Sequence, residues 1–200
     1  MKYINEFLKH FSKVPAFSAR DAELFLTYIG SSKKYPKRFL QNMLVGNKIF
    51  RLAKGEYTVH RNSEVIGFAF SPFYYGLAYA LSYYNVLEER ANPVIITTKS
   101  VRSGVRKSMG INISVFKLPK RMFFGYIMVK GESFYYPVSD LEKTFLDLVY
   151  FDISLRNDTL RRLVDRLDQK KLKEYLVRSP LWLKNRVEEL YERTLHANFR

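Results

Sequence analysis

The first 60 residues carry a succession of helix starts and stops that leaves few possible folds. Apolar residues at helical spacing predict a first helix over residues 3–12. Ser18, with Asp21 three positions later, is typical of the N-terminus of a second helix, which Gly30 ends. The first half of this region is therefore two short helices joined by a tight connection.

A third helix and a hairpin complete the region. Proline in the first turn and glycine at the end predict a helix over residues 35–46. Two short strands over residues 49–59 surround a turn at Gly55. Three helices followed by a hairpin are the order of a winged helix-turn-helix, which we predict over residues 1–61.

The outward face of the predicted third helix carries side chains that are suited to DNA. Arginine can bond guanine, and asparagine or glutamine can bond adenine, in bidentate fashion. Lysines on flexible stems, and charges on the hairpin, suit phosphates instead. We therefore expect base contacts from Arg38, Gln41 and Asn42, and phosphate contacts from Lys33, Lys34, Lys37, Arg51 and Lys54.

Residues 62–200 are predicted to form a second, mixed α/β domain. Ser71-Pro72 is typical of a helix start and predicts one long aromatic helix, SPFYYGLAYALSYYNVL. Runs rich in β-branched and aromatic residues predict four strands, in VIITTKS, INISVFKL, FFGYIMVKG and SFYYPVS. A mixed sheet follows from these strands.

The end of the chain is predicted to be helical. Ser139 and Glu142 form a capping-box pattern before a helix whose apolar face holds Leu141, Phe145, Leu148 and Val149. About three charged amphipathic helices follow, with an interruption at Ser179-Pro180. The expected fold class is α+β: an N-terminal winged helix-turn-helix, then a mixed α/β domain with a helical C-terminal extension.

Positive charge is concentrated in two segments. Residues 1–61 hold 12 Lys/Arg against 4 Asp/Glu, and residues 99–130 hold 8 Lys/Arg and no acid. This segregation favours a polyanionic partner over a general solubility device. The second segment predicts a second basic surface, for nucleic acid or for an acidic or RNA-bound protein, made of Arg102, Arg106, Lys107, Lys117, Lys120 and Arg121.

Several kinds of chemistry find little support in the composition. The chain has no cysteine and three histidines, which excludes disulfides and thiolate metal sites and leaves few ligands for zinc. Asp140, Glu142 and Asp147 raise a magnesium nuclease as an alternative, but the first two fall where acids stabilise a helix start. No cofactor is expected. Without a long apolar segment, we expect a cytoplasmic protein that does not enter membranes.

Five stretches of the chain resemble the AbiEi-type antitoxins and related transcriptional regulators of type IV toxin-antitoxin systems. They are FSARDAELFLTYIG, YPKRFLQNMLVGNKIFRLAKGEYTV, SPFYYGLAYALSYYNV, VIITT and PVSDLEKTFLDLVYF. The hairpin residues Arg51, Lys54, Gly55 and Tyr57 match the family, as does the segment 139–148, although Asp140 stands where the family often has proline.

The resemblance implies an N-terminal winged helix that represses its own operon and a C-terminal domain that counters a nucleotidyltransferase-like toxin. The implied partners are the protein's own double-stranded promoter DNA and the toxin or its RNA substrate. Two alternatives remain: a stand-alone winged-helix regulator, and a metal-dependent enzyme acting on nucleic acid. The sequence leaves open whether the chain forms a homo-oligomer on DNA.

Overall fold

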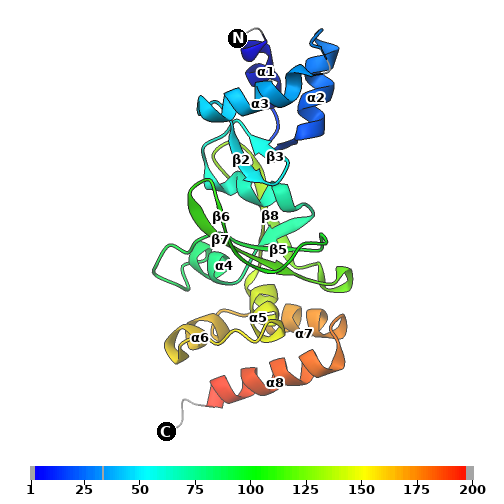
Figure 1. Cartoon of the computed structure of the whole chain (residues 1–200). Coiled ribbons are helices and arrows are strands. Elements are labelled where there is room, and N and C mark those ends of the chain that lie inside the picture. The colour runs from blue at the N-terminus through cyan, green and yellow to red at the C-terminus, as the bar shows by residue number, and fades with distance from the viewer. Residues whose placement is uncertain (1–2, 33, 197–200) are drawn as a thin grey trace.

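The chain forms an α+β fold whose elements are stacked in three tiers along the molecule (Figure 1). The computed structural model describes residues 3–32 and 34–196. Helices α1–α3 lie at one end, a large β-sheet occupies the middle, and helices α5–α8 lie at the other end (Figure 1). None of the described helices is both long and apolar enough to cross a lipid bilayer.

The first tier joins three helices to a small antiparallel sheet of strand order β1-β3-β2. Aromatic side chains fill its core, where the ring of Phe7 lies 5.0 Å from that of Phe39 and 4.6 Å from that of Phe11. The elements are α1 (Ile4–Phe11), β1 (Phe17–Ser18), α2 (Ala19–Tyr28), α3 (Tyr35–Val45), β2 (Phe50–Ala53) and β3 (Glu56–Thr58).

The caps and turns of this tier are those predicted. The Ser18 hydroxyl accepts a hydrogen bond from the Asp21 backbone N–H at 3.1 Å, and the Asp21 carboxylate accepts one from the Ser18 N–H at 2.8 Å, a complete capping box. Gly55 has φ +78°, the left-handed conformation that the β2–β3 turn requires. Strand β1 was not predicted, because two residues are too short to show a period.

The second tier is a mixed six-stranded sheet of order β6-β7-β5-β4-β9-β8. Strands β5 and β7 are parallel, as are β4 and β9, and the other pairs are antiparallel. Its strands are β4 (Phe73–Tyr75), β5 (Val94–Thr97), β6 (Gly104–Ser108), β7 (Ile111–Lys117), β8 (Tyr126–Lys130) and β9 (Tyr135–Ser139), accompanied by α4 (Ala78–Tyr83) and the 3₁₀ helices η1 (Ser63–Phe70) and η2 (Lys120–Met122).

The long aromatic helix predicted from Ser71 onward is wrong. Its first part is strand β4 between β5 and β9, and only α4 is helical. In β4, Tyr74 faces the core shared with the third tier, whereas Tyr75 faces the core on the first-tier side. The alternation of a strand lets two consecutive tyrosines enter opposite cores, which a helix cannot do.

Two further predictions are corrected. Residues 104–108, which lie outside the four predicted strands, form strand β6 at one edge of the sheet, paired with β7. The capping box of Ser139 and Glu142 is wrong by one residue, because Asp140 is the N-cap and accepts from the Lys143 N–H at 2.8 Å. Ser139 still belongs to β9, and its hydroxyl bonds that of Thr144 at 2.8 Å.

The third tier covers the sheet with four helices and confirms the predicted break at Pro180. They are α5 (Leu141–Tyr150), α6 (Asn157–Val164), α7 (Gln169–Val177) and α8 (Leu181–His196). The predicted apolar face of α5 is buried, Leu141, Phe145, Leu148 and Val149 included. Along the same helix, Lys143 and Asp147 form a fully buried ion pair.

The first tier is attached to the second through β2 and β3. Leu52 of β2 is buried in the core beside the large sheet, and its carbonyl accepts a hydrogen bond from the Ser108 hydroxyl of β6 at 2.8 Å. Lys99 lies 3.9 Å from the Glu56 carboxylate of β3 and donates to the Ala69 carbonyl at 2.9 Å. The small sheet therefore belongs to two cores at once.

Candidate nucleic-acid interface

The outward face of α3 is exposed along its whole length and polar except for Val45 at its end. Phe39, Leu40 and Met43 are buried against α1 and α2, and they fix the rotation of the helix about its axis. The opposite face holds five of the predicted DNA-binding residues, all of them exposed: Lys34, Lys37, Arg38, Gln41 and Asn42. Lys33, the other predicted residue of this segment, lies outside the described residues.

A groove separates this helix from the small sheet. Its lining includes Lys37 and Gln41 of α3, Arg51 of β2 and Tyr57 of β3. The Arg51 guanidinium lies 5.9 Å from the centre of the Tyr57 ring, which holds the charge on the groove side of the sheet. The structure thus brings two of the α3 candidates, Lys37 and Gln41, and one hairpin candidate, Arg51, to the same groove.

One acid in this groove was not anticipated from the sequence. Glu23 of α2 is exposed and lines the groove together with Lys37 and Arg51. A carboxylate there opposes a polyanion, so it reduces the attraction that its basic neighbours provide. Only the packing of α2 beside α3 reveals this position.

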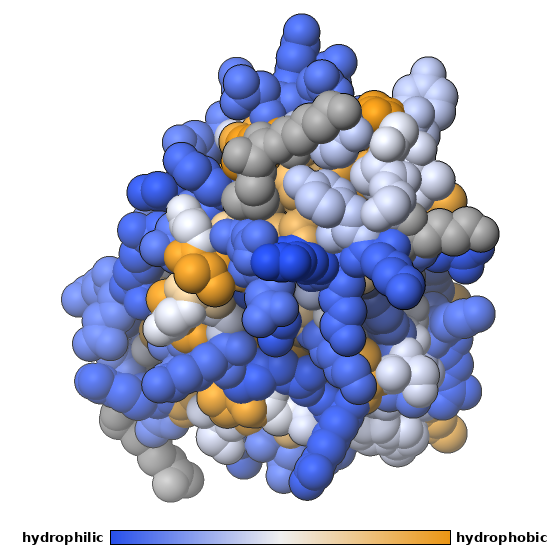
Figure 2. Space-filling view, turned by 45° about the horizontal axis from the view of Figure 1, so that its top comes forward, coloured by the Kyte–Doolittle hydropathy of each residue, from blue (hydrophilic) through white to orange (hydrophobic). Residues whose placement is uncertain are grey.

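The β2–β3 turn is short and is hydrogen-bonded to the start of α2. The Gly55 carbonyl accepts a hydrogen bond from the Ala19 N–H at 2.8 Å, which ties the turn to the start of α2. Lys54 beside it is exposed. Figure 2 shows the molecule with the N-terminal end turned forward, and hydrophilic residues cover most of that face.

The predicted second basic surface is spread over several elements. Arg102 precedes β6, and its carbonyl accepts a hydrogen bond from the Arg106 guanidinium, which also lies 5.6 Å from the centre of the Phe70 ring. The Lys117 N–H, at the end of β7, donates to the Ser103 hydroxyl at 3.1 Å. These contacts bring one group of candidates together around the β6–β7 hairpin.

The remaining candidates of this surface differ in position. Lys107 is exposed on β6, the strand that contacts the hairpin of the first tier through Ser108. Lys120 and Arg121 are exposed on η2, whose Met122 is buried in the core shared with the third tier. The β6 end of the basic segment therefore adjoins the first tier, whereas the η2 end adjoins the helices.

The acids near residue 140 are occupied in structural contacts. The Asp140 carboxylate caps α5 and accepts from the Tyr175 hydroxyl at 2.7 Å, and Lys171 lies 3.0 Å from Asp140 and 3.1 Å from Glu142. Burial raises the pKa of the Asp147 carboxyl, while Lys143 opposes the rise. Residues 3–32 and 34–196 include no group of three or more His, Cys, Asp or Glu placed to hold a metal ion.

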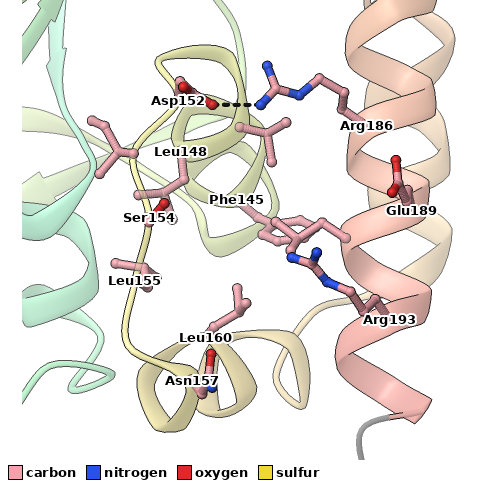
Figure 3. A pocket seen from close by; sticks show the side chains of 13 residues that line it. Phe145, Leu148, Asp152, Ser154, Leu155, Asn157, Leu160, Arg186, Glu189 and Arg193 are labelled. Atoms are coloured by element: carbon pink, nitrogen blue, oxygen red, sulfur yellow. Dashed lines mark hydrogen bonds and ion pairs between the residues drawn. The ribbon is translucent and has the colours of Figure 1, made fainter.

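A cavity of about 400 Å³ lies in the third tier between α5, α6 and α8 (Figure 3). Its floor is apolar and includes Phe145 and Leu148. At the rim, the Arg186 guanidinium donates to the Asp152 carboxylate at 2.6 Å, and Glu189 and Arg193 stand nearby on α8 (Figure 3). Two arginines and two acids balance in charge, so this cavity does not extend either basic surface.

Comparison with known proteins defines the fold alone. No protein-family model matches the chain, and no curated protein matches its sequence. Among solved structures, the chain is similar to the crystal structure of the RV2827C protein from Mycobacterium tuberculosis, with a TM-score of 0.64 and 12% sequence identity over 97% of this chain and 78% of that one. The arrangement of the tiers therefore occurs in another natural protein.

Proposed function

We propose that the first tier is a winged helix-turn-helix that binds double-stranded DNA, with α3 in the major groove and the β2–β3 hairpin as a short wing. The observation that carries the proposal is the exposed polar face of α3, joined by a groove to Arg51 of β2. The order α1-β1-α2-α3-β2-β3 agrees with it. A helix of this width fits the major groove of B-form DNA.

Each exposed side chain has a role in this proposal. Arg38, Gln41 and Asn42 contact base edges, because they occupy the outward face of the helix and belong to the residue types that bond bases in bidentate fashion. Lys34, Lys37, Arg51 and Lys54 contact phosphates, as we also expect for Lys33, and fix the position of the protein on the duplex.

The biological role we propose is that of a non-enzymatic antitoxin which represses its own operon and counters a nucleotidyltransferase-like toxin. Support comes from the sequence resemblance and from a second set of basic residues, exposed except for the half-buried Arg106, that the DNA-binding unit does not contain. In this role, the β6–β7 hairpin and η2 face the toxin or its RNA substrate. The alternative of a stand-alone regulator shares the DNA-binding unit and differs only in this second surface.

DNA binding is tested by fluorescence anisotropy with a duplex from upstream of the gene. We expect Lys37→Ala/Arg38→Ala/Asn42→Ala to abolish binding at near-physiological salt, because it removes phosphate and base contacts together. Lys170→Ala/Lys173→Ala on α7 is the control, since it removes two exposed lysines from the opposite end of the molecule. If both variants lose the same affinity, general charge explains binding and the assignment of α3 is wrong.

The antitoxin role needs a separate assay. Replacing Arg102, Arg106, Lys107, Lys117, Lys120 and Arg121 by glutamine should abolish rescue of growth from the neighbouring toxin and spare repression of the operon. If these residues contact DNA instead, the slope of log K against log salt should fall by about 0.9 for each lost phosphate contact, with rescue retained. No effect in either assay would leave the segment as a solvated surface.

A further inference from the structure

Strand β8 is an edge strand with apolar residues exposed to solvent. Among the described residues it pairs only with β9, at the end of the sheet order. Tyr126, Ile127 and Met128 are 39%, 47% and 56% exposed. Exposed apolar edges invite pairing with another strand, and proteins usually protect them with charges, bulges or covering elements.

The hydrogen-bonding phase of β8 defines which backbone groups are directed outward. At one end the Asp140 N–H donates to the Gly125 carbonyl at 3.0 Å, and at the other the Gly131 N–H donates to the Phe134 carbonyl at 2.9 Å. Because antiparallel ladders alternate, odd-numbered residues between these ends bond β9. The even-numbered residues Tyr126, Met128 and Lys130 therefore direct their N–H and C=O groups away from the sheet.

The opposite edge of the same sheet is protected. Strand β6 carries Arg106 and Lys107, and its Ser108 bonds the first tier. Charged side chains in the middle of an edge strand disfavour pairing with a like strand. Strand β8 has a charge only at its last residue, Lys130. The two edges therefore differ in whether charged side chains in the middle of the strand oppose pairing.

We propose that β8 pairs with β8 of a second copy of this chain, antiparallel and centred on Met128. This two-fold arrangement places Met128 opposite itself and Tyr126 opposite Lys130 of the other copy. The outward N–H and C=O groups of one strand then bond those of the other, and the Lys130 ammonium of each copy lies beside the Tyr126 ring of the other. A strand from a different protein would not need to match this two-fold symmetry. β8 also has no pattern of charges that would favour such a strand over a second copy of itself.

The pairing makes one continuous sheet through two chains and relates the two first tiers by a two-fold axis. If α3 binds DNA as proposed above, the dimer presents two such helices to a palindromic site. The pairing itself does not depend on DNA binding. Its tests therefore use the protein alone.

The absence of cysteine allows a direct test by cross-linking. Met128→Cys in the 200-residue chain places one thiol opposite its own copy, with a Cα separation of about 5.5 Å, which a disulfide can span. We expect mild oxidation to give a covalent dimer on a non-reducing gel. The matched control is Val105→Cys on β6, which is 72% exposed and should stay monomeric on the gel.

A second variant tests the same pairing by sedimentation equilibrium. Met128→Lys places two lysines opposite each other, so the dissociation constant of the dimer should rise at least about tenfold. The site is exposed, so the melting temperature should stay close to that of the wild type, while Val105→Lys should leave the dimer unchanged. A wild type that remains monomeric, an unaffected Met128→Lys dimer, or equal cross-linking at both edges would each overturn the proposal.

Discussion

The ion pair of Lys143 and Asp147 gives a quantitative prediction about stability. Both side chains are 0% exposed, and the Tyr74 hydroxyl donates to the Asp147 carboxylate at 2.8 Å. Lys143→Met keeps an unbranched side chain one atom shorter than lysine but leaves a buried carboxylate without its cation. Breaking a buried pair in this way costs about 3 to 5 kcal/mol, because the remaining charge is neither solvated nor compensated.

The matched double variant separates the loss of a partner from the loss of packing. Lys143→Met/Asp147→Asn removes both charges and keeps an oxygen that accepts from Tyr74, so we expect it to recover at least about half of the loss. Lys173→Met is the control for an exposed lysine: it lies on α7, and we expect a change in the free energy of unfolding within about 0.5 kcal/mol.

The assay is urea unfolding followed by the fluorescence of Trp182, the one tryptophan of the chain. This residue lies on α8, its ring 5.6 Å from that of Tyr150 at the end of α5, so it reports on the helices around the pair. Thermal unfolding followed by the same fluorescence gives a second measure. At about 2 to 4 °C per kcal/mol for a chain of this size, the melting temperature of Lys143→Met should fall by about 6 to 20 °C. A loss below about 1 kcal/mol, or a double variant as unstable as the single one, would refute the reasoning.

Three further predictions concern the first tier. Arg38→Ala should weaken binding to the promoter duplex by about 1 to 3 kcal/mol and leave binding to random DNA nearly unaffected, whereas Lys37→Ala should weaken binding to both duplexes alike. If Arg38→Ala lost as much affinity for random DNA as for the promoter in an anisotropy titration, base contact by Arg38 would be excluded. Glu23→Gln should strengthen DNA binding a few-fold at low salt and less at high salt, and Glu174→Gln on α7 should not; an unchanged affinity would place the groove outside the DNA contact. Leu52→Ala should lower the free energy of unfolding by about 2 to 5 kcal/mol, measured in urea, because the side chain is buried in the core beside the large sheet; a loss near zero would mean that this contact does not couple the tiers.

The elements that the sequence predicted well are those defined by local chemistry. Ser18 and Asp21 satisfy each other's backbone groups within one turn, and Gly55 supplies the one left-handed conformation that the hairpin needs. These signals lie within four residues of their effect. The five described α3 candidates are exposed on one helical face for the same reason, since helical spacing alone determines the face.

The errors arose where distant segments decide the structure. Tyr74 and Tyr75 form a strand because β5 and β9 lie on either side of them, and Gly76 fits there because a Cβ would lie 2.6 Å from the Ile96 side chain. Nothing near residue 76 in the sequence indicates this contact. The division of the second basic surface between β6 and η2 likewise depends on strand order, which a count of charges along the chain does not contain.

The shared use of the small sheet by two cores has a mechanical consequence. Tyr57 of β3 packs with α1–α3, and Leu52 of β2 packs with the large sheet. The two tiers are therefore joined by a shared sheet and not by a flexible linker. With α3 seated on a duplex, helices α6–α8 at the far end of the molecule would then point in one fixed direction around the DNA axis (Figure 1). Moving a binding site by about 5 base pairs, half a helical turn, would turn that end to the opposite side of the DNA. A protein bound to helices α6–α8 would therefore change sides of the DNA whenever the binding site is moved by half a helical turn.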